Sequence, residues 1–341
     1  MFSASDTFNY SLFTIHYSLI MRPLLLLSSA MLLTASVLFI AASRSQHAKP
    51  ELPIMQSFSA TPRFDNHQQI FDKTIDLSRW DLHERYEREL TNFCYTHNST
   101  ILTLKRANRL FPILVPILRE EGVPEDFIYL CCIESSLNQR ALSPAKAAGL
   151  WQFMPETARQ YGLVVNDEVD ERYHTIKATH AACQYFKDGY KRFGDWMAVA
   201  ASYNAGMGGI QKRLSSQQET DPMDLFLPEE TSRYMFRLMA MKEIFRDPYR
   251  YGFVLYSDQL YRPIRTRQIR VASPIADLTA FAKQHNTSYY QVKEFNPWLR
   301  DSKISARKGS TLNYQIDIPL EEDMNYSQPF PVYDKNWVVD K

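Results

Sequence analysis

The chain has 341 residues, of which 45% are hydrophobic and 23% are charged, and its formal net charge is +1. This length and composition allow one large core or two smaller ones and argue against extensive disorder. The near-zero net charge gives the molecule as a whole no attraction to a polyanion.

The N-terminal segment has the pattern of an export signal. Arg22 precedes a run without charged residues from Pro23 to Ala42, and small residues end this run. About 20 apolar residues can span a bilayer, so residues 1–45 are predicted to be either a signal peptide or an uncleaved membrane anchor. Met21, directly before the positive flank, is the expected true start. The protein is therefore expected to be exported to the periplasm or cell envelope, which also disfavours nucleic acid as a partner.

A helical block is predicted after a linker. Residues 46–80 show no sustained period and are predicted to be the linker. Residues 81–250 are predicted to form one all-α domain because apolar residues recur at helical spacing. Individual helices are expected at about 155–162, 175–193, 195–203 and 229–246, and Pro112 and Pro116 are expected to bend an earlier one.

The C-terminal part has a different pattern. Residues 262–308 hold ten Lys or Arg against three Asp or Glu, a net charge of +7. A strand at 267–271, helices at 275–285 and 288–295 and a strand at 314–318 predict a small α+β (βααβ) module over residues 262–320. The fold class is thus mainly α with a small α+β module.

The cysteines predict neither a metal site nor a cofactor. Cys94, Cys131, Cys132 and Cys183 show no C-x-x-C or Cys/His spacing. Cys131 and Cys132 lie in an apolar run and are expected to be buried free thiols. A bridge from Cys94 to another cysteine stays open.

Glu134 is the candidate catalytic residue. It follows a run of apolar residues from Phe127 to Ile133. Apolar surroundings raise the pKa of a carboxyl group, and a carboxyl that stays protonated near neutral pH can act as a general acid in glycoside cleavage. A solvated glutamate, or one paired with an arginine, is the alternative.

Glu134 begins the first of four blocks in the chain. They are Glu134-Ser135-Ser136-Leu137-Asn138 with Ser143, Gly149-Leu150-Trp151-Gln152-Phe153-Met154-Pro155, Ala201-Ser202-Tyr203-Asn204-Ala205-Gly206, and Glu230-Thr231-Ser232-Arg233-Tyr234. Together they resemble the transglycosylase (SLT) domain of family 1 lytic transglycosylases, with an order and spacing like the membrane-bound type D branch. The resemblance implies a lysozyme-like helical domain.

The resemblance also implies the substrate-binding residues. Ser143 and Gln152 are expected to hydrogen-bond sugar groups, with turn capping and a solvated side chain as their alternatives. Trp151, Phe153 and Met154 are expected either to form the floor of the cleft or to belong to the core, and for Phe153 the core is favoured. Met154 is counted among the substrate-binding candidates. Tyr203 and Asn204 are expected to face the cleft, and Tyr234 resembles the late tyrosine near the catalytic acid.

The implied reaction needs one carboxyl group and no cofactor. Glu134 protonates the bond between N-acetylmuramic acid and N-acetylglucosamine and then takes a proton from the sugar's 6-hydroxyl, which closes a 1,6-anhydro ring. The neighbouring acids Glu156, Asp167, Glu168 and Asp170 are expected to be solvated. The alternatives are a hydrolytic muramidase of lysozyme type and a catalytically idle wall-binding protein.

The tail resembles a LysM peptidoglycan-binding module. The resemblance rests on Asp277-Leu278-Thr279, Phe295-Asn296-Pro297 and a closing Tyr314-Gln315-Ile316-Asp317-Ile318-Pro319, although the usual glycine-rich opening is missing. It implies that peptidoglycan glycan strands are the partner.

Overall fold

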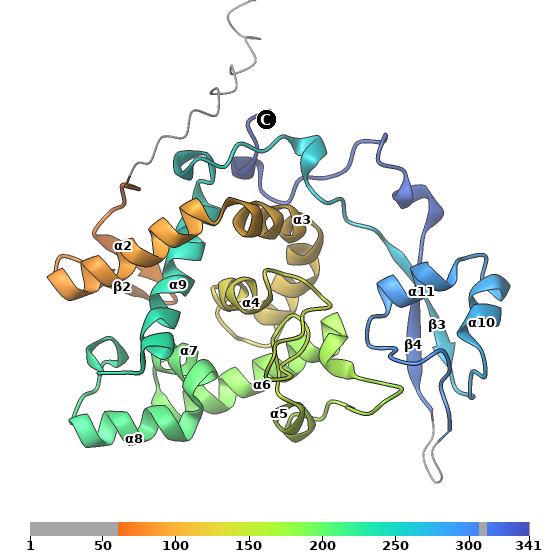
Figure 1. Cartoon of the computed structure of the whole chain (residues 1–341), viewed down its shortest axis with the longest axis horizontal. Coiled ribbons are helices and arrows are strands. Elements are labelled where there is room, and N and C mark those ends of the chain that lie inside the picture. Colours follow the sequence, from red (N-terminus) through yellow and green to blue (C-terminus); the bar gives the residue numbers. More distant parts are fainter. Residues whose placement is uncertain (1–60, 307–311, 341) are drawn as a thin grey trace, which may run out of the picture. The chain divides into compact units, whose positions relative to one another are not determined.

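The structure, a computed structural model, describes residues 61–306 and 312–340 (Figure 1). The predicted signal or anchor over residues 1–45 lies outside these residues. Among the helices that are described, none is both long and apolar enough to cross a bilayer.

A β-hairpin occupies part of the predicted linker. Strands β1 (His67–Ile70) and β2 (Lys73–Asp76) pair antiparallel, with Ile70 opposite Lys73. Ile70 is fully buried, and the Phe71 ring lies 4.7 Å from that of Phe127. The predicted linker over 46–80 is therefore wrong for residues 67–76, since a hairpin of four-residue strands is too short to show a clear period.

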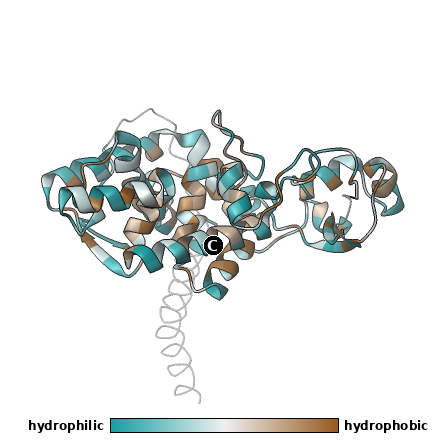
Figure 2. Cartoon of the chain, turned by 90° about the horizontal axis from the view of Figure 1, so that it is seen from below, coloured by the Kyte–Doolittle hydropathy of each residue, from teal (hydrophilic) through white to brown (hydrophobic). Residues whose placement is uncertain are grey.

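The helical block is confirmed. Its helices are α2 (Trp80–Tyr95), α3 (His97–Glu120), α4 (Phe127–Ser135), α5 (Pro155–Gln160), α6 (Thr175–Phe193), α7 (Trp196–Ala205), α8 (Met207–Gln217) and α9 (Glu229–Arg246). Helix α3 continues through Pro112 and Pro116, and α8 is not among the predicted helices. Most helices carry both hydrophilic and hydrophobic residues in Figure 2, as expected of helices that bury one side.

Helix α4 lies in the middle of this block (Figure 1). Seven of its nine residues are buried, so it has no polar face and packs on several sides, against α3 and α9 among others. The helix stops after Ser135 because Ser136 and Leu137 adopt left-handed backbone angles, with φ of 50° and 55°. The buried helix therefore ends one residue beyond Glu134.

The predicted βααβ module is present. It consists of β3 (Thr266–Val271), α10 (Leu278–Gln284), α11 (Tyr289–Phe295) and β4 (Tyr314–Pro319), and β3 pairs antiparallel with β4. The buried Asn296 joins helix to sheet, since its amide donates to the Val292 and Asp317 carbonyl oxygens (2.8 and 2.7 Å) and its side-chain oxygen accepts from the Asp317 N–H (2.8 Å).

The module shares its core with the helical block. Ala148, Val169 and Tyr173 of the helical block belong to the same buried cluster as Leu278, Val292, Trp298 and Ile316 of the module. The Asp170 N–H also donates to the Trp298 carbonyl (2.9 Å), and the Arg300 N–H to the Glu168 carbonyl (2.8 Å). The two parts are therefore packed together and are not merely joined by a tether.

The last described residues return to the helical block, which the sequence did not predict. The Trp337 indole is buried and donates to the Phe245 carbonyl (2.9 Å). Asn108 of α3 accepts from the Tyr333 N–H (2.7 Å), and the Val339 N–H donates to Leu255 (3.0 Å). Residues 331–339 thus close one side of the helical core.

All four cysteines are buried and free. The expectation for Cys131 and Cys132 is confirmed, and Cys94 forms no bridge.

Candidate active site

Glu134 lies in the last turn of α4, and one hydrogen bond fixes its carboxyl group. The hydroxyl of Tyr234 on α9 donates to Glu134 Oε1. Tyr234 is 3% exposed, so its ring cannot easily turn away. The structure thus brings together the predicted acid and the predicted late tyrosine, which are 100 residues apart in the chain.

The surroundings of Glu134 hold its pKa near neutral pH. This pKa is raised from 4.5 to about 7, chiefly by burial and also by the Glu230 charge, against the opposing effects of the Tyr234 hydrogen bond and the Arg237 charge. Both protonation states are therefore populated around pH 7. A group that must first give and then recover a proton works best in this range.

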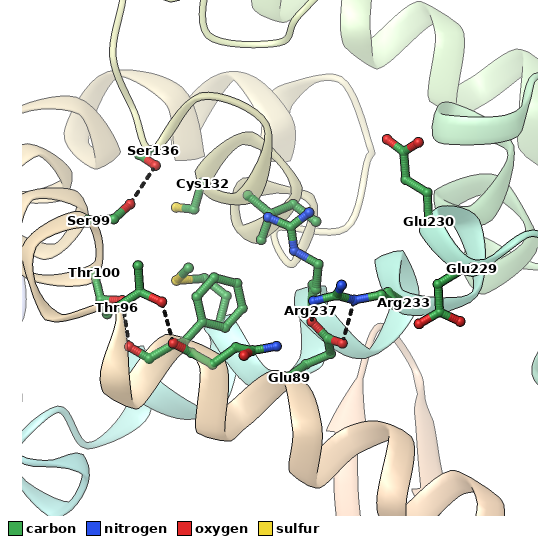
Figure 3. A pocket seen from close by; sticks show the side chains of 14 residues that line it. Glu89, Thr96, Ser99, Thr100, Cys132, Ser136, Glu229, Glu230, Arg233 and Arg237 are labelled. Carbon is green, nitrogen blue, oxygen red and sulfur yellow. Dashed lines mark hydrogen bonds and ion pairs between the residues drawn. The ribbon is translucent and has the colours of Figure 1, made fainter.

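A cavity of about 630 Å³ opens beside this end of α4 (Figure 3). Cys132, Ile133 and Ser136, which flank Glu134 in the chain, line one side of it, and Glu230, Arg233 and Arg237 of α9 line another. The sequence did not single out Arg237 or consider Glu230 as a charged neighbour of Glu134. Their positions depend on how α9 lies across α4, which no local pattern reveals.

Tyr203 and Asn204 make contacts within the protein. The Tyr203 hydroxyl donates to the Trp151 carbonyl (2.6 Å), and its ring lies 5.0 Å from that of Tyr185. Asn204 accepts from Thr231 Oγ1 (2.7 Å) and donates to Glu230 Oε1 (3.4 Å). Both side chains thus tie the end of α7 to neighbouring segments, one of which carries Gln152.

Ser143 and Gln152 shape the loop that carries them. Ser143 Oγ accepts from the Ala147 N–H (2.9 Å), which is the turn capping considered as its alternative. The Gln152 amide donates to the Gly149 carbonyl (2.8 Å) and the Ala141 carbonyl (3.4 Å), so the solvated alternative does not describe it.

The apolar residues of the same loop divide into core and surface. Trp151 is fully buried and its indole donates to Thr179 Oγ1 (2.9 Å), and Phe153 is also buried. Both belong to the core. Met154 is 40% exposed and remains available to a ligand.

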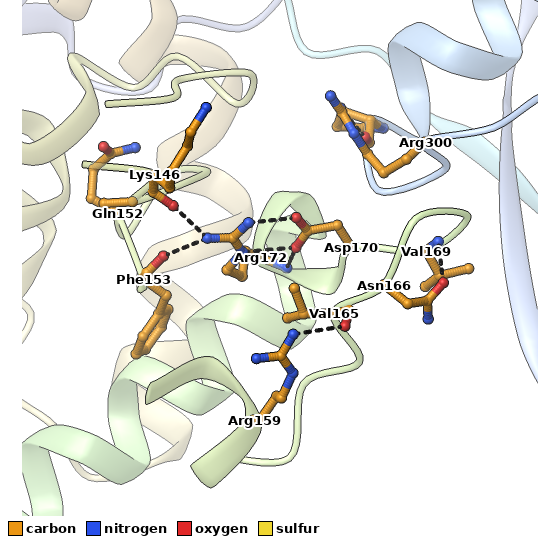
Figure 4. A network of polar contacts seen from close by, with 12 residues as sticks. Lys146, Gln152, Phe153, Arg159, Val165, Asn166, Val169, Asp170, Arg172 and Arg300 are labelled. Carbon is orange, nitrogen blue, oxygen red and sulfur yellow. Dashed lines mark hydrogen bonds and ion pairs between the residues drawn. The ribbon is translucent and has the colours of Figure 1, made fainter. Parts of the chain in front are cut away.

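A buried ion pair holds the backbone of the loop that carries Ser143 and Gln152 (Figure 4). The Arg172 guanidinium pairs with Asp170 (2.7 Å) and donates to the Lys146 and Phe153 carbonyls (2.7 and 3.0 Å). Gly149 has φ +77°, and a Cβ there would lie 1.9 Å from the Arg172 carbonyl oxygen. Only glycine therefore fits where the loop crosses Arg172.

The prediction that the acids following Glu134 in the chain are solvated is partly wrong. Asp170 is buried in its pair with Arg172, so the prediction of a solvated side chain is wrong for it. Glu168 is partly exposed, and its carboxylate accepts from the Ser305 N–H and hydroxyl (2.8 Å each). Asp167 and Glu156 are exposed, as expected. Among the residues that the structure describes, no group of three His, Cys, Asp or Glu could hold a metal ion.

Comparison with protein families gives two matches. Residues 115–226 match the transglycosylase SLT domain, and residues 267–322 match the soluble lytic transglycosylase C-terminal LysM-like domain. The first match contains three of the four blocks described above, and the block Glu230–Tyr234 lies beyond its end. The second match covers the βααβ module.

Two curated proteins are similar to this chain. The membrane-bound lytic murein transglycosylase D of Escherichia coli is 29% identical over 230 residues, 66% of this chain and 49% of that protein. A putative tributyltin chloride resistance protein from an Alteromonas species is 31% identical over 121 residues, 34% of this chain and 58% of that protein. The chain thus spans about half the length of the first of these relatives.

Solved structures show weaker similarity. The 70 kDa soluble lytic transglycosylase of Escherichia coli is 19% identical, with a TM-score of 0.35 over 49% of this chain and 31% of that one. An inactive mutant of the lytic transglycosylase Slt from Pseudomonas aeruginosa is 24% identical, with a TM-score of 0.31 over 39% of this chain and 23% of that one.

Proposed function

We propose that this chain is a peptidoglycan lytic transglycosylase with Glu134 as its acid and base, because residues 115–226 match a transglycosylase SLT domain and residues 267–322 match a LysM-like domain of the lytic transglycosylase type. The observation that carries the proposal is the pairing of Glu134 with Tyr234 at the end of a buried helix, where the pKa of the carboxyl group is about 7.

The first chemical step uses protonated Glu134. Its proton passes to the glycosidic oxygen between N-acetylmuramic acid and N-acetylglucosamine as the bond from that oxygen to the anomeric carbon breaks. Tyr234 donates a hydrogen bond to Glu134 Oε1, and this bond strengthens as the carboxylate gains its charge. The muramyl N-acetyl group of the substrate stabilises the cationic sugar.

The second step returns the proton. The Glu134 carboxylate takes the proton of the muramyl 6-hydroxyl, and the oxygen of that hydroxyl bonds to the anomeric carbon. No water is consumed, and Glu134 ends the cycle protonated. The nucleophile belongs to the same sugar, which gives it the advantage of an intramolecular reaction.

The acidic residues that could serve as a base for water already make contacts within the protein, which favours ring closure over hydrolysis. Asp170 and Glu168 have their carboxylates occupied by Arg172 and Ser305. Glu230 acts on the charge of Glu134, and its carboxylate accepts from the Asn204 amide at 3.4 Å. If water were the nucleophile, Glu230 is the carboxylate best placed to activate it.

The remaining site residues have supporting roles in this proposal. Tyr203, Asn204, Ser143 and Gln152 hold the walls of the cleft through the contacts described above, and Met154 offers an exposed apolar surface to a sugar ring. The C-terminal module contributes affinity for peptidoglycan strands. The enzyme acts in the periplasm or cell envelope, attached to the membrane if residues 23–42 are retained as an anchor, and neither a cofactor nor nucleic acid takes part.

The test is mass spectrometry of the products released from purified peptidoglycan. We expect 1,6-anhydromuramyl ends, which are lighter than hydrolysed ends by one water, about 18 Da. Glu134→Gln should reduce cleavage by at least about 10²–10⁴-fold, the usual contribution of an acid–base group. Reducing muramyl ends would point to the hydrolytic alternative, and intact strands would point to a wall-binding protein.

A further inference from the structure

Arg237 lines the cavity beside Glu134. It lies one turn of α9 beyond Arg233 and Tyr234, among the residues that line the cavity in Figure 3. Its side chain is partly buried, and its guanidinium carbon lies 5.8 Å from the centre of the Phe93 ring.

The other charged side chains of the cavity are already engaged. Glu89, which is 1% exposed, accepts from Arg233 at 2.8 and 3.1 Å and from Arg88 at 2.9 Å. Glu229 is bound by Arg88 at 2.8 Å, and Glu230 accepts from Asn204. Within residues 61–306 and 312–340, Arg237 has neither an ion pair nor a hydrogen bond, so its five N–H donors are free for a ligand.

The chemistry of the guanidinium defines the ligand. Its planar donors match a carboxylate or phosphate in a two-pronged arrangement, and such charge-assisted pairs are stronger than neutral hydrogen bonds. A strand of alternating N-acetylglucosamine and N-acetylmuramic acid offers carboxylates only on its muramyl residues, as the lactyl group or the peptide attached to it.

We propose that Arg237 binds a carboxylate of the peptide stem carried by a muramyl residue next to the cleaved bond, so that the cavity of Figure 3 is a stem-recognition site. This inference rests on the proposed function, and it adds a specificity that the sugar-cleaving chemistry does not require. Arg237 would then select strands that carry peptides over strands from which the peptides have been removed.

Stem binding would also act on the catalytic acid. The Arg237 charge lowers the pKa of Glu134. A bound carboxylate neutralises much of this charge, so the pKa of Glu134 rises when the substrate binds. A larger fraction of Glu134 is then protonated at the moment when it must act as an acid.

The experiment compares two soluble substrates, glycan strands with intact peptides and the same strands stripped by an amidase. The stripped strands keep only the lactyl carboxylate next to the sugar ring, so the comparison separates a stem carboxylate from a lactyl carboxylate as the group that Arg237 binds. The variants are Arg237→Gln, Arg237→Lys and, as a matched control, Lys212→Gln on the exposed side of α8. For the unaltered protein we expect a KM on the order of 10- to 100-fold lower for strands with peptides, as a charge-assisted pair provides.

The variants should separate stem recognition from chemistry. Arg237→Gln should abolish the preference by raising KM for strands with peptides only, Arg237→Lys should retain part of it, and Lys212→Gln should keep all of it. Dissociation constants measured in a Glu134→Gln background, where no strand is consumed, should follow the same order.

Three results would overturn the inference while leaving the proposed function intact. They are an unaltered protein that cleaves both substrates equally, an Arg237→Gln variant that loses activity equally on both, and equal dissociation constants for the two strands in the Glu134→Gln background. If the unaltered protein cleaves neither substrate but still binds strands with peptides more tightly through Arg237, the proposed function fails and the binding site stands.

Discussion

Replacing Glu134 with Gln should stabilise the protein at alkaline pH while it removes catalysis. The pKa of Glu134 is raised from 4.5 to about 7 in the folded protein. A carboxyl group with a raised pKa favours folding when protonated, so this contribution is fully present below pH 4.5 and is lost as the pH rises through 7.

The size of this stability change follows from the difference between the pKa values of Glu134 in the unfolded and folded protein. Each pH unit between them corresponds to about 1.4 kcal/mol, so ionisation of Glu134 costs at most about 3.5 kcal/mol of folding free energy. The Gln side chain cannot ionise, but its oxygen can still accept the hydrogen bond from Tyr234. The variant should therefore be more stable than the unaltered protein by up to about 3 kcal/mol at pH 8, with the difference mostly absent at pH 4.5.

The assay is urea unfolding at pH 4.5, 6 and 8, followed by fluorescence, for the unaltered protein, Glu134→Gln and Glu156→Gln. Glu156 is an exposed residue of α5 and makes a matched control for the same chemical change. It should show no comparable gain between pH 4.5 and pH 8. A stability difference for Glu134→Gln that does not depend on pH, or that grows as the pH falls, would refute the reasoning.

Three further predictions concern the groups around the site. Tyr234→Phe removes a hydrogen bond that lowers the pKa of Glu134, so the alkaline limb of the kcat/KM profile should move up by about one pH unit; an unmoved limb would exclude the role of Tyr234. Gly149→Ala should cost at least about 3 kcal/mol in urea unfolding, since its Cβ meets Arg172, whereas Gly162→Ala, with φ +82° and open space, should cost only about 1 kcal/mol. Replacing residues 267–319 by a short Gly/Ser bridge should lower the Tm and weaken pelleting with insoluble peptidoglycan; an unchanged Tm would contradict the shared core.

The elements with a strong local signal could be predicted from the sequence. The run from Phe127 to Ile133 has no polar face, which indicates a buried helix, and the placement of Glu134 at its end follows directly. The βααβ pattern was readable because strand, helix and turn residues change clearly after position 262. The helices α6 and α9 agree with their predicted bounds for the same reason.

The residues that the sequence did not reveal depend on tertiary contacts. Asp170 looked like part of a solvated loop because its pair with Arg172 becomes buried only when Arg172 also donates to the Lys146 and Phe153 carbonyls in the folded protein. Nothing in the local sequence distinguishes Arg237 from the other arginines, because its place near Glu134 depends on the packing of α9 against α4. Ser143 and Gln152 have the residue types of sugar ligands, yet their side chains hold the loop itself.

The return of residues 331–339 to the helical core changes how the C-terminal module should be regarded. The helical domain is discontinuous in sequence: Trp337 and Val338 complete its core from beyond β4, so the module is an insertion held at both ends. Cutting the chain before β3 therefore removes a part of the helical domain together with the module. The appropriate excision replaces residues 267–319 by a short Gly/Ser bridge and keeps Trp337 in place, so that the module's affinity for the wall is measured on an intact helical domain.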